Sequence, residues 1–200
     1  MQALLAVDVQ NEFSAGGQRT VPNHAQALGQ IHRHVEQARS EARPIAWVRH
    51  HNKPTESQAF VPGSWGAEWS PGMGLESGDS SGYGSEKLFE KEVYGAFTGT
   101  GLEEWLRTLG VTEVLIVGFY AHMCVSTSVR EALVRGFDVL IDPEATGARD
   151  LEDPALGRQS ADEVRRTALL QVLNMGANIA GAGTIAGIGS AAREPAAATA

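Results

Sequence analysis

The chain has 200 residues, 42% of them hydrophobic, which is enough for one ordinary core and short for two domains. Its formal net charge of −8 argues against binding to nucleic acids or to anionic membranes. The single cysteine excludes an internal disulfide framework, and the absence of signal-peptide and membrane-span patterns favours a cytoplasmic protein.

Apolar and amphipathic segments alternate along the first half of the chain. Residues 3–9 form a short apolar run that predicts a buried strand, and residues 23–42 have the spacing of an amphipathic helix. Further strands are predicted at residues 45–49 and 87–91. Between them, residues 51–85 are rich in Gly, Pro and Ser, and so long a loop in a compact domain is typical of a functional segment.

The second half continues this alternation. Strands are predicted at residues 113–119, 138–141 and 177–180, and helices from the Thr100 cap to Gly110, from Cys124 to Gly136, and from the Ser160–Glu163 capping box to about Met175. The last residues are rich in Ala and Gly and show no period. We therefore expect a single domain at residues 1–180 and a tail at residues 181–200.

The repeated strand–helix–strand units predict right-handed crossovers and a parallel sheet covered on both faces. We expect a three-layer α/β/α fold whose doubly wound, mainly parallel, six-stranded sheet has the strand order 3-2-1-4-5-6. Ligands of such sheets bind beyond the carboxyl ends of the strands, where the strand order reverses. This reversal would bring together Asp8, at the end of the first strand, and Cys124, at the start of the helix after the fourth.

Three residues could carry chemistry at this place. A helix N-terminus lowers the pKa of a thiol, which would make Cys124 a nucleophile, although free cysteines are also common as small buried hydrophobes. Asp8 could be a general acid and base, or it could simply end the strand. Lys91 could stabilise a thiolate, or it could be a solvated lysine at a strand edge.

Three segments carry a resemblance that bears on these alternatives. They are LLAVDVQNEF (residues 4–13), KEVYGAFTGTGLEEWL (residues 91–106) and VGFYAHMCVSTSVREALVRGFDVLIDPEA (residues 117–145). Together they resemble the signature blocks of the isochorismatase-like cysteine hydrolases, which include nicotinamidases, N-carbamoylsarcosine amidase and biuret hydrolase. The resemblance extends in the same order over residues 3–180.

The resemblance implies a catalytic triad of Asp8, Lys91 and Cys124. It also implies a cis peptide bond between Phe119 and Tyr120, which would turn the N–H of Tyr120 toward an oxyanion shared with the N–H of Cys124. The implied activity is hydrolysis of a C–N bond in a small amide, carbamoyl or ureido substrate through an acyl-enzyme on the thiol. The implied assembly is a homodimer or homotetramer.

The segment after the second strand departs from the nicotinamidase pattern. Nicotinamidases carry a metal-binding Asp-x-His there, whereas this chain has VRHHNKP without an Asp. The adjacent His50 and His51 would point to opposite faces of an extended segment, which makes them a poor metal pair. We therefore expect no catalytic metal and no cofactor.

The substrate contacts can be suggested from residue type. Phe13 or Trp65 could stack on a planar substrate, although Trp65 could instead pack at a subunit interface. Tyr120 and His122 are further tentative contacts, and His122 could equally bond within its own turn.

Two other functions stay open from the sequence. The segment GFYAHMC also resembles true isochorismatases, which cleave a vinyl ether and carry glycine where this chain has Cys124. The cysteine therefore favours amide hydrolysis. The chain could also be a non-catalytic member of the fold that bears a reactive thiol.

Overall fold

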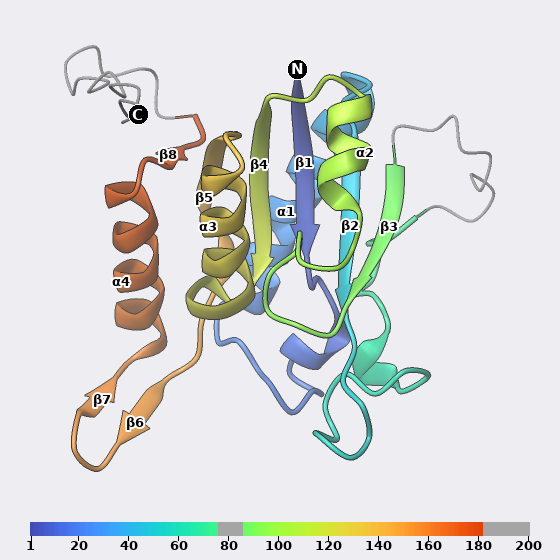
Figure 1. Cartoon of the computed structure of the whole chain (residues 1–200). Coiled ribbons are helices and arrows are strands. Elements are labelled where there is room, and N and C mark those ends of the chain that lie inside the picture. Colours follow the sequence, from blue (N-terminus) through green and yellow to red (C-terminus); the bar gives the residue numbers. More distant parts are fainter. Residues whose placement is uncertain (76–85, 182–200) are drawn as a thin grey trace, which may run out of the picture.

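The computed structural model describes residues 1–75 and 86–181, which are built on a six-stranded sheet (Figure 1). The strands are β1 (Gln2–Val7), β2 (Ile45–His50), β3 (Glu86–Lys91), β4 (Glu113–Phe119), β5 (Asp138–Gly147) and β8 (Asn178–Ile179). They lie in the order β3-β2-β1-β4-β5-β8, and each neighbouring pair is parallel. The predicted α/β class and strand order are confirmed, with β8 as the sixth strand of the sheet.

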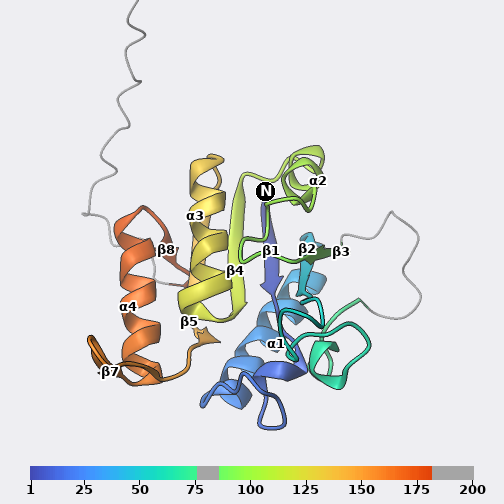
Figure 2. The same ribbon diagram turned by 60° about the horizontal axis from the view of Figure 1, so that its bottom comes forward.

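Helices cover both faces of this sheet (Figures 1 and 2). The helices are α1 (His24–Ser40), α2 (Leu102–Thr108), α3 (Ser126–Val134) and α4 (Ala161–Asn174). Side chains of β1 alternate between two apolar clusters: Leu4 and Ala6 pack with α1, while Leu5 and Val7 pack with α2, α3 and α4. Because β1 is buried on both faces, it reads in the sequence as a continuous apolar run.

The helix starts follow local capping. Ser160 accepts a hydrogen bond from the N–H of Glu163, and the Glu163 side chain accepts one from the N–H of Ser160, so the predicted capping box of α4 is confirmed. The cap of α2 is Gly101, one residue beyond the predicted Thr100. The Thr100 hydroxyl still accepts a hydrogen bond from the N–H of Leu102.

The helix after β4 differs from the expectation. Residues Ala121–Val125 form a π-helical turn, η3, and the regular α3 begins at Ser126. Cys124 therefore lies inside η3 rather than in the first turn of an α-helix.

The end of β5 also differs from the expectation. β5 continues to Gly147 instead of ending at residue 141, because a register shift lets Thr146 pair with Gly118. The Thr146 hydroxyl donates a hydrogen bond to the Gly118 carbonyl at 2.7 Å. Beyond it, β6 (Leu151–Asp153) and β7 (Gly157–Gln159) form an antiparallel hairpin that was not predicted, because its exposed residues carry no apolar pattern.

Two expectations concern residues beyond the described part of the chain. Residues 76–85 of the predicted long loop and residues 182–200 of the predicted tail lie outside it. The division into a domain and a tail therefore stays a prediction. Among the helices that the structure describes, none combines the length and the apolar character that crossing a bilayer requires.

Candidate active site

The carboxyl ends of β1 and β4 form the base of the site. Val7 pairs with Gly118, whose φ is +117°, and a Cβ at Gly118 would collide with the carbonyl oxygen of Val7. Glycine is therefore needed for the two strands to approach here. Asp8 follows directly, with a φ of +54° in the left-handed region that Asp tolerates better than most residues. This geometry places the segment after β4 beside Asp8.

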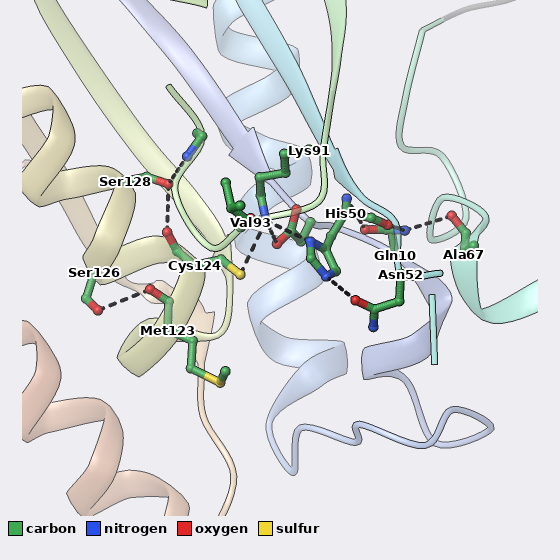
Figure 3. A network of polar contacts seen from close by, with 12 residues as sticks. Gln10, His50, Asn52, Ala67, Lys91, Val93, Met123, Cys124, Ser126 and Ser128 are labelled. Carbon is green, nitrogen blue, oxygen red and sulfur yellow. Dashed lines mark hydrogen bonds and ion pairs between the residues drawn. The ribbon is translucent and has the colours of Figure 1, made fainter. Parts of the chain in front are cut away.

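Asp8, Lys91 and Cys124 meet at this point. Figure 3 shows the Lys91 side chain directed toward Cys124 and His50. The Lys91 Nζ atom lies 2.8 Å from Asp8 Oδ2 and 3.4 Å from Cys124 Sγ. The three residues are 0%, 3% and 7% exposed, in the order Asp8, Lys91 and Cys124. The structure thus brings together the three side chains that the sequence placed on separate strands and a helix.

The ammonium group of Lys91 has more acceptors than protons. Besides Asp8 and Cys124, it contacts the carbonyl oxygen of Val93 at 3.1 Å and His50 Nδ1 at 3.4 Å. Since an ammonium carries three N–H groups, these four acceptors cannot all be satisfied at once. His50 and the thiol have the two longest contacts and therefore compete for one proton.

His50 is held as a neutral acceptor toward Lys91. Burial and the Lys91 cation lower the pKa of His50, so its ring is uncharged at neutral pH. Its Nε2 atom lies 2.9 Å from the Asn52 side-chain oxygen, which can only accept. The proton of His50 therefore sits on Nε2, and Nδ1 presents a lone pair to Lys91.

The same surroundings set the charge states of Lys91 and Cys124. Burial by itself would lower the pKa of Lys91, but Asp8 and Cys124 outweigh it and raise this pKa, so Lys91 is a cation. Burial and the Asp8 carboxylate raise the pKa of the Cys124 thiol, and Lys91 offsets this rise in part. The pKa of Cys124 is therefore raised overall, whereas a position at a helix N-terminus predicts a lowered pKa.

A neutral thiol needs a base, and Asp8 is placed to be one. Asp8 Oδ2 is occupied by Lys91, whereas Asp8 Oδ1 is buried without a hydrogen-bond partner in the described part of the chain. A buried carboxylate oxygen without a hydrogen-bond partner costs free energy, and in a native structure such an oxygen calls for a functional explanation. This oxygen can accept the proton of a neighbouring thiol.

Neighbouring side chains fix the site from both sides. The Gln10 amide donates to the carbonyl oxygens of His50, at 3.0 Å, and Ala67, at 2.8 Å, and its oxygen accepts from the N–H of His50. On the other side, Ser128 donates to the Cys124 carbonyl at 2.6 Å and accepts from the N–H of Ala96. The Gln10 bonds tie the segment after Asp8 to His50, and the Ser128 bonds tie the segment after Lys91 to Cys124.

The peptide bond between Phe119 and Tyr120 is cis. The Tyr120 carbonyl accepts from the N–H groups of Met123 and Val125, which anchors η3 to the end of β4. The Tyr120 hydroxyl donates to the carbonyl oxygen of Arg19 at 2.5 Å, and burial raises the pKa of Tyr120 to about 12. The oxyanion-binding role of the Tyr120 and Cys124 N–H groups stays a prediction.

A cavity of about 360 Å³ opens onto Asp8 and Cys124. Two of the four suggested substrate contacts, Phe13 and Tyr120, line this cavity, with their ring centroids 4.8 Å apart. Trp65 does not line it and is 55% exposed.

His122 also lies outside this cavity. It lines a separate cavity beside α4 and stacks on Tyr120 with centroids 5.0 Å apart. Both of its ring nitrogens are buried without a hydrogen-bond partner in residues 1–75 and 86–181. Burial and the Arg149 cation lower the pKa of His122 to about 4.

The cavity contains polar residues that the sequence did not suggest as substrate contacts, among them Arg19, His50, Asn52 and Arg149. They come from three segments that are distant in the sequence, since His50 and Asn52 lie two residues apart, and no motif connects the three segments. The adjacent His50 and His51 have different surroundings, since His51 Nδ1 lies 3.7 Å from Glu90. In residues 1–75 and 86–181, no group of three or more His, Cys, Asp or Glu side chains could hold a metal.

Comparison with known proteins places this chain in a family. A model of the isochorismatase domain matches residues 2–175. Nicotinamidase 3 of Arabidopsis thaliana is 30% identical over 154 residues, which cover 72% of each chain. The nicotinamidase/pyrazinamidase of Mycobacterium tuberculosis is 30% identical over 196 residues, covering 86% of this chain and 98% of the relative. The crystal structure of a putative isochorismatase from Burkholderia xenovorans LB400 matches with a TM-score of 0.78 and 28% identity, covering 89% of this chain and 82% of that one. The chain belongs to the isochorismatase family and is a hydrolase.

Proposed function

We propose that this hydrolase cleaves a C–N bond of a small amide, carbamoyl or ureido substrate, without a metal, through an acyl-enzyme on Cys124. The observation that supports this most is the contact of Lys91 with both Asp8 and Cys124 at the inner end of a cavity. The names of the nicotinamidase relatives support an amide as the substrate class.

The proposed reaction begins with a neutral thiol. Asp8 takes the thiol proton while the sulfur attacks the substrate carbonyl carbon, so that a C–S bond forms and the carbonyl oxygen becomes an oxyanion. The backbone N–H groups of Tyr120 and Cys124 are the proposed donors to this oxyanion. Asp8 then returns the proton to the nitrogen as the C–N bond breaks, which releases an amine or ammonia and leaves a thioester.

Water completes the cycle. The Asp8 carboxylate removes a proton from a water molecule that attacks the thioester, and it protonates the thiolate as the C–S bond breaks. Lys91 stays charged throughout and offsets the negative charge that moves between Asp8, the sulfur and the oxyanion.

The test is a screen for ammonia release over a panel of amides, carbamoyl compounds and ureido compounds. Cys124→Ala should abolish turnover, and mass spectrometry should find an acyl adduct on the peptide that contains Cys124. Thr127→Ala, in α3 directly after η3 and outside the cavity that holds Cys124, is the matched control and should retain activity.

Two results would reject the proposal. Isochorismate cleavage that survives in Cys124→Ala would assign the chain to vinyl-ether hydrolysis. A thiol that reacts with iodoacetamide, in a protein that turns over no member of the panel, would indicate a non-catalytic protein.

We further propose that the enzyme works in the cytoplasm as a homodimer or homotetramer, with no nucleic-acid or membrane partner. A net charge of −8 and a lone, buried cysteine support this setting. Large apolar side chains that are exposed in the single chain support self-association, among them Val134 at 78% and Leu156 at 90% exposure. Sedimentation of the full chain measures the assembly.

A further inference from the structure

Two arginines line the cavity that holds Cys124. Arg19 lies in the loop between η1 (Asn11–Phe13) and α1, and Arg149 follows β5. Neither guanidinium has a hydrogen bond or an ion pair with any residue that the structure describes. Other arginines of the chain do have acidic partners, as in the pairs Arg135–Glu103 and Arg158–Asp150. Two unpaired cations in one cavity stand out in a chain whose net charge is −8.

The other charges around the cavity do not cancel these cations. At the inner end, Asp8 is neutralised by the Lys91 ammonium at 2.8 Å, and His50 is uncharged. The remaining acid in the lining is Glu56, which is exposed and accepts a hydrogen bond from the N–H of Lys53. Among the lining residues, the outer part therefore carries two cations and one anion.

The arginines act on the interior of the cavity. Tyr120 lines the cavity directly before η3, and both Arg149 and Arg19 lower its pKa, against a larger rise from burial and a smaller rise from Glu12. The field of both guanidiniums thus reaches the wall of the cavity next to Cys124. A guanidinium also matches the planar fork of a carboxylate better than an ammonium does.

We propose that Arg19 and Arg149 bind a carboxylate on the substrate, so that the enzyme prefers small amides that carry an acidic group at the end opposite the scissile bond. This inference rests on the proposed amide hydrolysis. A cavity of about 360 Å³ suits a molecule of a few carbon atoms that spans from the sulfur to the arginines.

The first experiment measures binding without turnover. The rates at which iodoacetate and iodoacetamide alkylate Cys124 are compared, because the two reagents differ mainly in charge. Arg19→Gln and Arg149→Gln should each lower the iodoacetate rate about tenfold, the typical effect of losing a charged hydrogen bond, and leave the iodoacetamide rate nearly unchanged. Glu56→Gln removes a negative charge and should raise the iodoacetate rate relative to the iodoacetamide rate.

Arg33→Gln is the matched control, because Arg33 is exposed on α1 and does not line the cavity. It should leave both rates unchanged. The proposal would be overturned if the ratio of the iodoacetate rate to the iodoacetamide rate were the same in the wild type and in both cavity variants. Inorganic phosphate that protects Cys124 where succinate does not would also overturn it, in favour of a phosphate-bearing ligand.

The second experiment uses a matched pair of amides in the full-length enzyme. Succinamate carries a carboxylate where succinamide carries a second amide. The value of kcat/KM should be about tenfold higher for succinamate, and each arginine variant should remove this preference mainly through KM. Equal use of both amides by the wild type would contradict the carboxylate site while leaving amide hydrolysis intact. If the iodoacetate preference depends on the arginines but no amide is turned over, the proposed amide hydrolysis is wrong and the carboxylate site still stands.

Discussion

The Lys91 ammonium lies 2.8 Å from the Asp8 carboxylate, and both side chains are almost completely buried, at 0% and 1% exposure. Removing one member of a buried ion pair leaves the other charge without compensation. Loss of either partner should therefore destabilise the fold as well as impair the proposed chemistry.

Lys91→Met should lower the free energy of unfolding by about 3–5 kcal/mol, because Asp8 then keeps a buried charge without a partner. The measurement is chemical denaturation at pH 7. Lys53→Met is the matched control, since the pair of Lys53 with Glu92 is 60% and 63% exposed. Removing that pair should change the stability by less than about 1 kcal/mol. The double variant Asp8→Asn, Lys91→Met should lose less stability than the sum of the two single variants.

The thiol should be alkylated slowly at neutral pH. Because burial and Asp8 raise the pKa of Cys124 above its ordinary value, the iodoacetamide rate should keep rising above pH 9. Asp8→Asn removes a group that raises this pKa, and it should shift the pH profile to lower pH. Lys91→Met removes the cation that lowers it and should shift the profile to higher pH. An unchanged profile in Lys91→Met would contradict the role assigned to Lys91.

His50 should weaken the hydrogen bond that Lys91 donates to the Cys124 thiol. When His50 is replaced by Phe, one N–H of Lys91 loses its second acceptor and becomes fully available to Cys124 Sγ. The pKa of the thiol should fall, and alkylation at pH 8 should become a few times faster, as expected for one added charged hydrogen bond. His50→Gln keeps an acceptor at this place and should restore the wild-type rate in part.

His51→Phe is the control for this effect, since the ring of His51 contacts Glu90 rather than the ammonium group of Lys91. It should leave the alkylation profile unchanged. Slower alkylation of His50→Phe than of the wild type would mean that His50 stabilises the thiolate. It would contradict the inference that His50 and the thiol compete for one N–H of Lys91.

Activity should survive removal of metal ions. The proposed chemistry is supplied by Asp8, Lys91 and Cys124, and the rings of the adjacent His50 and His51 contact different residues, Lys91 and Glu90. Overnight dialysis against EDTA or 1,10-phenanthroline should leave kcat and KM unchanged in the ammonia-release assay. A loss of activity that zinc or iron restores would show that the enzyme uses a metal.

The sequence determined the fold because the signals that carry it are local. Buried parallel strands are continuous apolar runs, as in residues 113–119. The start of α4 is predicted by the capping box from Ser160 to Glu163. Residue order also indicated which strand ends meet, and so suggested Asp8 and Cys124 as neighbours. The hairpin of β6 and β7 escaped prediction because its exposed residues have no apolar period.

The tertiary structure alone decided the electrostatics of the site. The position of Cys124 near the start of a helix predicts a lowered thiol pKa, whereas its burial beside Asp8 raises it. Likewise, no pattern in the chain connects Arg19 with Arg149, which the fold brings to one cavity. A shift in pKa and a binding surface depend on burial and on distances between remote segments, so both arise only when the chain has folded.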